Sequence, residues 1–173
     1  VMFLVLSVQL SAQKLIQYQS GMGSRDPGNA AVWILYNHVT AQHEGMTLVA
    51  DSALLDTEVN DLSAFDNVQI FLTDTTTIYG DYLYYDGTKR IVEVWGDTVV
   101  LIDGNTTLYT DNLTYDRNTS VATYHNWGRA VNGARILTSC NGTYNSNNEH
   151  FTIYDDVVLE NGNNTLLTDT LLY

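Results

Sequence analysis

Carboxylates are the most abundant side chains in this sequence that could do chemistry. There are 20 Asp and Glu residues, and pairs such as Asp61 with Asp66, or Asp155 with Asp156, could act as the two carboxylates of a glycosidase. No spacing selects one pair over the others, and Asp recurs throughout in settings typical of turns. This recurrence favours a structural role, in which carboxylates accept hydrogen bonds from free backbone N–H groups. We therefore predict no catalytic residue and no enzymatic activity.

The compact group His38, His43 and Glu44 has the residue types of a metal site. A metal site needs three or four converging ligands, whereas these residues lie at a strand corner and in the turn before Gly45. We interpret both histidines as solvated loop residues and predict neither a metal nor another cofactor. Sequence motifs for a nucleophile elbow, a phosphate-binding glycine loop or a dinucleotide site are absent. The lone Cys140 cannot form an internal disulfide, and we predict that it fills a small core position.

The charge balance excludes some classes of partner. The formal net charge is −13 and the seven Lys and Arg residues are scattered, so no basic stripe can follow the phosphates of a nucleic acid. The same charge argues against direct adhesion to an anionic membrane surface without bridging divalent cations. The composition, with 12 Tyr and a single Pro, favours strands and tight turns. We therefore expect an all-β protein.

The first ten residues, VMFLVLSVQL, are typical of the hydrophobic core of a signal peptide. They are too few to span a bilayer, and Ser11 and Ala12 supply the small residues of a cleavage site. We expect residues 1–12 to be the remnant of a signal peptide that is cleaved after Ala12, with the sequence starting inside that peptide. Residues 13–30 then form an N-terminal segment with room for one degenerate strand.

Two sequence markers repeat along the chain with one period. The first is a small residue followed by a polar anchor, and the anchors lie at intervals of 29 or 30 residues: Asp51, Asp81, Asp111, Cys140 and Asp169. The second is an aromatic residue, a short polar break and then Val, and the aromatics lie 27 to 32 residues apart: Tyr36, Phe65, Trp95, Trp127 and Tyr154. Repeats of this size, with three short strands each, must stack around one shared core.

The strand around each anchor presents a conflict of phase. Large apolar residues recur three positions before the anchor and two positions after it, as Ile78 and Leu83 do around Asp81. In an unbroken strand these positions lie on opposite faces. We therefore predict a kink at the anchor, where the preceding small residue permits close backbone approach. The predicted structural caps of the N–H groups freed by this kink are Asp51, Asp81, Asp111 and Asp169.

The alternation of the two markers resembles the OstA-like family, also called the LptA family, of periplasmic lipopolysaccharide transport domains. The likeness rests on residues 80–86 (GDYLYYD), 110–116 (TDNLTYD) and 66–70 (DNVQI), and it covers residues 31–173 in five units. It implies an elongated, open β-jellyroll of about five stacked repeats of short antiparallel strands, in the periplasm of a Gram-negative bacterium. We expect this jellyroll to be truncated at its C-terminal end, where another turn residue is due.

The resemblance implies that lipopolysaccharide, or another lipid, binds with its acyl chains in an apolar groove. The residues that it implies for the groove are Val39, Leu48, Val68, Ile70, Ile78, Val99, Leu101, Leu108, Val157, Leu159 and Leu166. It also implies that other OstA or Lpt-type jellyrolls, or further copies of this chain, join end to end by strand addition at unpaired edges. The domain would be a transport or bridging module in outer-membrane biogenesis.

Two further hypotheses compete with lipid transport. The sheets could close fully on their own side chains, and the chain would then be a structural repeat or assembly module of a larger outer-membrane protein, without bound lipid. The chain could also be a polysaccharide lyase or hydrolase on a parallel β-solenoid. That third hypothesis needs a cluster of acidic and basic residues in one loop, and the sequence has no such cluster.

Overall fold

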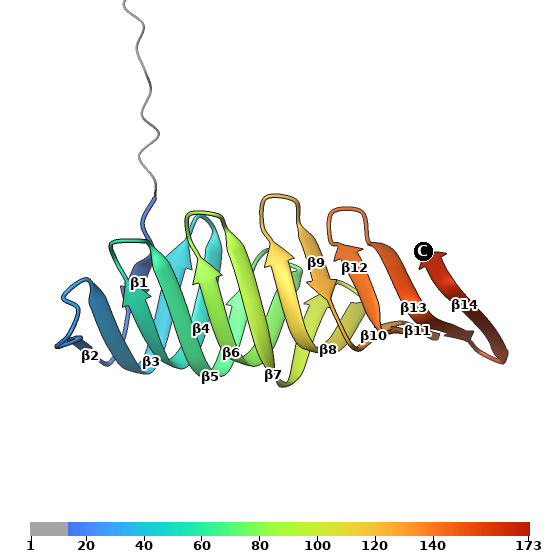
Figure 1. Ribbon diagram of the computed structural model, residues 1–173, viewed down its shortest axis with the longest axis horizontal. Coiled ribbons are helices and arrows are strands. Elements are labelled where there is room, and N and C mark those ends of the chain that lie inside the picture. Colours follow the sequence, from blue (N-terminus) through green and yellow to red (C-terminus); the bar gives the residue numbers. More distant parts are fainter. Residues whose placement is uncertain (1–13) are drawn as a thin grey trace, which may run out of the picture.

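The computed structural model describes residues 14–173, so the predicted signal-peptide remnant lies outside the described residues. The described chain consists of strands and turns without a helix, which confirms the all-β prediction. The strands succeed one another along an elongated molecule (Figure 1). Their bounds are β1 Gln17–Gln19, β2 Met22–Arg25, β3 Val32–His43, β4 Met46–Asp56, β5 Asp61–Phe71, β6 Thr76–Asp86, β7 Ile91–Asp103, β8 Thr106–Asp116, β9 Val121–Tyr124, β10 Gly128–Asn132, β11 Arg135–Ser139, β12 Asn141–Asn145, β13 His150–Asn161 and β14 Asn164–Leu172.

Consecutive strands from β3 to β8 pair antiparallel in a meander. β8 then pairs through its first half with β10 and through its second half with β9. β13 pairs through its first half with β12 and through its second half with β11. These short strands are therefore halves of long strands that are interrupted midway. β1 and β2 pair with the two halves of β3, and β14 pairs with β13. The predicted stack of antiparallel repeats is confirmed.

Each long strand bends near its middle. At the bend, the polar break of the second sequence marker lies opposite the anchor residue of the first marker. In β5 the register shifts between Phe65 and Val68. The two residues between them, Asp66 and Asn67, have φ angles of 62° and 51°, a left-handed conformation that Asn and Asp adopt more readily than most residues. Opposite this pair on β6 lies a single residue, the anchor Asp81. The same arrangement recurs between β3 and β4 and between β13 and β14, which confirms the predicted kink.

The bend also resolves the conflict of phase. On β4 the buried residues are Met46, Leu48 and Ala50 before the bend, then Ala53 and Leu55 after it. The step from Ala50 to Ala53 spans three residues, whereas side chains of a regular strand alternate with a period of two. One irregular step therefore keeps apolar side chains on the inner face along the whole strand.

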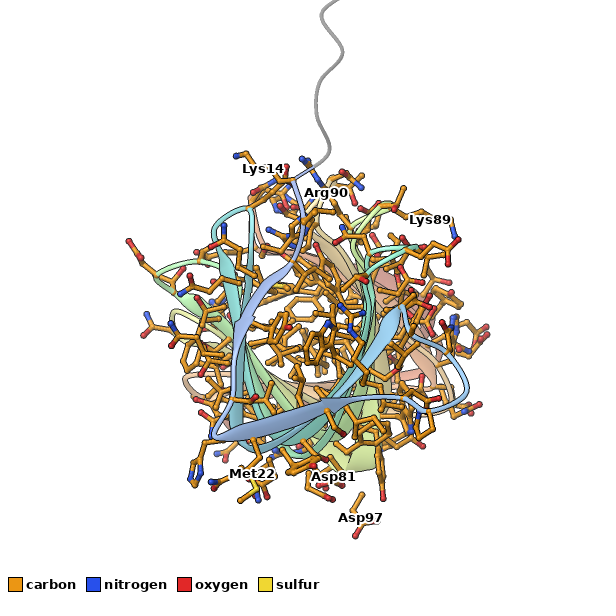
Figure 2. All side chains as sticks on the ribbon, turned by 90° about the vertical axis from the view of Figure 1, so that its left-hand side faces the viewer. Lys14, Met22, Asp81, Lys89, Arg90 and Asp97 are labelled. Carbon is orange, nitrogen blue, oxygen red and sulfur yellow. The ribbon has the colours of Figure 1, made fainter. Side chains whose placement is uncertain are left out.

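The bends divide the molecule into two arms with one hydrophobic core between them. The first arm contains β1, β10 and β11 with the halves of the long strands that are in line with them, which are the second halves of β3, β5, β7 and β13 and the first halves of β4, β6, β8 and β14. The second arm contains β2, β9 and β12 with the other halves. Viewed along the long axis, Asp81 and Asp97 lie on the side of the bends, and Lys14, Lys89 and Arg90 lie on the opposite side (Figure 2). We call the side of the bends the corner, and the side where the turns of both arms face each other the mouth. The first-arm turns at the mouth are residues 43–46, 71–76, 103–106, 132–135 and 161–164, and the second-arm turns are 56–61, 86–91, 116–121 and 145–150.

Candidate functional site: the interior between the arms and its mouth

The residues that the resemblance implied for a groove converge on one continuous core. Nine of the eleven are at most 1% exposed, and all nine lie on the first arm: Val39, Leu48, Val68, Ile70, Ile78, Val99, Leu101, Leu108 and Val157. Leu159 is partly buried against the same core. The same core includes buried side chains of the second arm, such as Leu55 and Leu83, so the interior between the arms is filled with protein side chains. Their role in lipid binding stays a prediction.

Leu166 differs from the other ten. It lies on β14, opposite Leu159, and is 47% exposed, so it is not buried in the core, and its predicted contact with lipid stays a prediction. The physical reason for its exposure is its place on the last strand, because no described segment packs over it. Leu167 and Leu172 on the same strand are exposed as well. β14 therefore presents apolar side chains and a free backbone edge at one end of the molecule.

The core is not wholly aliphatic, because buried tyrosines contribute rings and hydroxyl groups. Tyr85, Tyr124 and Tyr144 are among its largest fully buried side chains. Each hydroxyl is hydrogen-bonded to a polar group, since an unpaired buried hydroxyl is costly. The Tyr124 hydroxyl pairs with Ser139 Oγ at 2.6 Å near the corner, whereas those of Tyr85 and Tyr144 lie near the mouth. These tyrosines place polar contacts at the edges of an otherwise apolar interior.

A first polar tie crosses the mouth between His43 on the first arm and Tyr85 on the second. His43 Nε2 lies 2.7 Å from the Lys14 carbonyl oxygen, which can only accept, so Nε2 carries the proton. Nδ1 then accepts from the Tyr85 hydroxyl at 2.6 Å. The Tyr85 oxygen accepts in turn from Arg117 Nη1 at 2.6 Å. Burial raises the pKa of Tyr85 although Arg117 opposes the shift, which keeps the hydroxyl protonated as a donor.

Charged groups extend this first tie. Arg117 Nη2 donates to the carbonyl oxygens of His43 at 3.3 Å and Glu44 at 3.0 Å. Arg90, on the second arm, forms an ion pair with the Glu44 carboxylate. His43 is only 3% exposed, so the prediction of a solvated loop histidine is wrong for this residue. His38 is exposed at the corner, as predicted.

A second tie joins Asp103 on the first arm to Tyr144 on the second. The Tyr144 hydroxyl donates to Asp103 Oδ2 at 2.8 Å, and Thr76 Oγ1 donates to Oδ1 at 3.0 Å. Burial, and to a smaller extent the hydrogen bond to Asp103, raise the pKa of Tyr144. The carboxylate is therefore satisfied by hydroxyl groups, although it is only 7% exposed. This contact holds the two arms together midway along the molecule.

A third tie lies toward the C-terminal end. Arg135 Nη1 donates to the Tyr173 hydroxyl at 2.5 Å, and the guanidinium carbon lies 5.7 Å from the centre of the Tyr173 ring. Arg135 begins β11 on the first arm, and Tyr173 bonds through its backbone to Phe151 on the second. Since the partners of all three ties are far apart in sequence, sequence patterns alone did not reveal them.

The predicted caps have different partners. Asp81 Oδ2 accepts from the backbone N–H of Asp97 at 2.9 Å. Asp51 Oδ2 accepts from the side-chain amide of Asn67 at 2.7 Å, and Asp111 Oδ1 accepts from that of Asn112 at 2.6 Å. Asp169 is exposed opposite the bend of β13.

The fourth anchor, Cys140, does not fill the predicted core position. It is partly exposed at the corner, because the repeat places its anchor residue on the outer side of the bend. Its thiol lies 3.7 Å from Asp156 Oδ2.

Other kinds of site find little support in the structure. Among residues 14–173, no group of three or more His, Cys, Asp and Glu side chains could hold a metal ion. Within the same residues, no helix is long and apolar enough to cross a membrane. A hollow of about 830 Å³ lies beside the first tie and is lined by residues 14–17 and 42–47. The interior between the arms, with its mouth, is therefore the candidate site.

Comparisons with known proteins found one family and one group of solved structures that the chain resembles. Among solved structures, the chain resembles LptH, described as the LptA-homologous periplasmic component of the lipopolysaccharide transport device of Pseudomonas aeruginosa. The two are 9% identical, the match covers 88% of this chain and 93% of that one, and the TM-score is 0.41. No curated protein matches the chain. The sequence model of the family described as OstA-like protein matches residues 16–169, so the chain belongs to the OstA-like protein family.

Proposed function

We propose that this chain is a periplasmic transport or bridging module of a Gram-negative bacterium that carries the acyl chains of lipopolysaccharide, or of a related lipid, between its arms. It binds its cargo without transforming it. Residues 31–173 form the carrying unit in this proposal, and the predicted groove residues contact the acyl chains. The observation that carries the proposal is the continuous apolar core, which extends through all repeats of an OstA-like chain.

The energetics of such a core suit a fatty chain. Each methylene removed from water contributes about 0.8 kcal/mol, so a long acyl chain gains several-fold more than thermal energy by entering. Because the core is filled, the chain must replace contacts between side chains of the two arms. The cost of that exchange falls if the arms can separate, since the inner faces of both are apolar along their length.

The ends of the molecule support a bridging role. β14 pairs only with β13, and β1 and β2 pair only with β3, so backbone donors and acceptors are free at both ends of the described sheet. Free strand edges join other strands readily. Other OstA or Lpt-type jellyrolls, or further copies of this chain, are the proposed partners, and nucleic acid is not.

Lipid binding is tested by site-specific photo-cross-linking in a Gram-negative host. A photoreactive amino acid at Val68 or Ile78, both buried, is expected to capture lipopolysaccharide. The matched controls are Gln69 and Tyr79, the outward neighbours on the same strands, which are expected to capture none. Mass spectrometry of lipids that co-purify with the chain identifies the cargo. Absence of lipid from both measurements contradicts the proposal.

A structural role without lipid is the second candidate, and the filled core favours it. In that case the arms stay closed, and the chain serves as a repeat or assembly module of a larger outer-membrane protein. Concentration-dependent end-to-end association, measured by analytical ultracentrifugation on lipid-free protein, would support this second role if photo-cross-linking at Val68 and Ile78 captures no lipid.

A further inference from the structure

We propose that the mouth is a lateral gate through which acyl chains enter sideways, closed by the three polar ties and by the contacts of the Asn60 side chain with the backbone of Ile16 and Lys14. This inference rests on the proposed lipid-carrying function and adds the route of entry and the contacts that control it. The gate consists of the His43, Tyr85 and Arg117 network with the Glu44–Arg90 ion pair, then the Asp103–Tyr144 contact, and finally the Arg135–Tyr173 contact.

The ties form a regular series along the long axis. His43 and Tyr85 are 42 residues apart, Asp103 and Tyr144 are 41 apart, and Arg135 and Tyr173 are 38 apart. Each one joins a first-arm turn to a strand end or turn of the second arm. The near-constant separation exceeds one 30-residue repeat, so each tie connects neighbouring repeats obliquely across the mouth. The closure is therefore a property of the stack rather than of one local contact.

The mouth differs from the corner in the kind of bond that holds it. At the corner the two arms are continuous through the bent strands. At the mouth, backbone hydrogen bonds connect turns of the same arm, such as Gly87 N–H to the Asn60 carbonyl and Ser146 N–H to the Ser120 carbonyl. The ties across the mouth all use at least one side chain. The arms can thus part at the mouth without breaking a β-ladder, with the corner acting as the hinge.

The mouth carries basic side chains that could meet a lipid head group once they are released. Lys14, Lys89 and Arg90 lie on this side (Figure 2), where Lys89 and Arg90 form ion pairs with the carboxylates of Asp86 and Glu44. A lipid that enters sideways keeps its polar head in water while its acyl chains pass between the arms. Opening would release Arg90 from Glu44 and Arg117 from two carbonyl oxygens. Guanidinium groups bind phosphate well, so the opened mouth presents donors to an anionic head group.

A reversible cross-link tests the gate. In a Cys140→Ser background, Glu44→Cys and Arg90→Cys are joined by a short bis-maleimide whose linker is cleaved by reductant. We expect the linked protein to take up fluorescent lipopolysaccharide at least about tenfold more slowly, because the open state is no longer populated. Cleaving the linker is expected to restore uptake in the same molecules. The matched control links Lys89→Cys to Asn118→Cys, which lie on adjacent turns of one arm, and should leave uptake unchanged.

Loosening the tie should act in the opposite direction. Arg90→Ala removes the ion pair across the mouth, and we expect uptake about two- to fivefold faster, the factor that corresponds to one exposed ion pair. Lys89→Ala removes an ion pair within a single arm and is expected to have no such effect. Equal uptake by linked and cleaved protein overturns the gate while lipid carriage stands. No uptake by either form, nor by the unlinked chain, overturns the proposed function itself.

Discussion

Asp81 Oδ2 accepts a hydrogen bond from the backbone N–H of Asp97 at 2.9 Å, so the anchor of one strand satisfies a donor at the bend of the next. The same separation of 16 residues recurs between Asp51 and Asn67 and between Cys140 and Asp156. A side chain at the bend of each of these strands thus contacts the following bend. The corner is held together by a repeated local contact in addition to the β-ladder.

Replacing the Asp81 carboxylate should weaken this corner. Asp81→Ala leaves the Asp97 N–H without its acceptor, and we expect a loss of about 0.5–2 kcal/mol in the free energy of unfolding. Urea unfolding followed by circular dichroism measures the change. Asp97→Ala is the control, because Asp97 contributes its backbone to this hydrogen bond, and a change within about 0.5 kcal/mol is expected. Equal losses in both variants would contradict the capping role.

The small residue before the anchor should be needed for packing. A Cβ atom at Gly80 would lie 2.4 Å from Val94 Cγ1, which is well inside van der Waals contact. We expect Gly80→Ala to destabilise the fold by about 1–3 kcal/mol through overpacking. Combining it with Val94→Ala should recover part of the loss, since that change removes the clashing methyl group. A double-mutant cycle from chemical unfolding measures this coupling, and simple additivity would refute the steric explanation.

Removing the Tyr144 hydroxyl should destabilise the second tie. Tyr144→Phe leaves the buried Asp103 carboxylate with fewer donors, and the expected cost is about 1–3 kcal/mol. The control is Tyr109→Phe on β8, whose partly exposed ring lies outside the tie. Differential scanning calorimetry compares the variants. A midpoint for Tyr144→Phe that equals that of the control would show that the tie contributes little to stability.

The alkaline dependence of stability should report on Tyr84. The hydrogen bond that its hydroxyl donates to Asp61 at 2.5 Å, and to a smaller extent burial, raise the pKa of Tyr84 to about 12. The folded protein therefore holds this proton more tightly than the unfolded chain, in which the Tyr pKa is about 10. The stabilising contribution is complete below about pH 10 and is lost as the pH rises toward about 12.

Tyr84→Phe is expected to remove this part of the alkaline loss. Urea unfolding at several pH values in that range measures it, and tyrosinate absorbance follows the titration directly. Tyr79→Phe, on the same strand, is the control and should keep the slope of the parent chain. An unchanged slope in Tyr84→Phe would contradict the assignment to this hydroxyl.

The sequence by itself determined the repeat, the all-β class and the bends. Each of these depends on residues close together in the chain: the polar pair that adopts positive φ, the small residue beside the anchor, and the alternation of apolar side chains. Local conformational preference and a period of 29 or 30 residues suffice to identify them, and the family resemblance followed from the same pattern. The inward positions of the first arm, such as Leu48 and Val68, could be predicted for the same reason.

Only the tertiary structure decided how the mouth is closed. His43 and Arg117 are 74 residues apart. They meet because the stacking of the repeats shifts one arm along the other, and no local sequence pattern encodes this shift. His43 was therefore mistaken for a solvated residue, and Cys140 for a buried one. Their burial depends on what packs over a turn or an outer bend, and that is set by neighbours in space rather than in sequence.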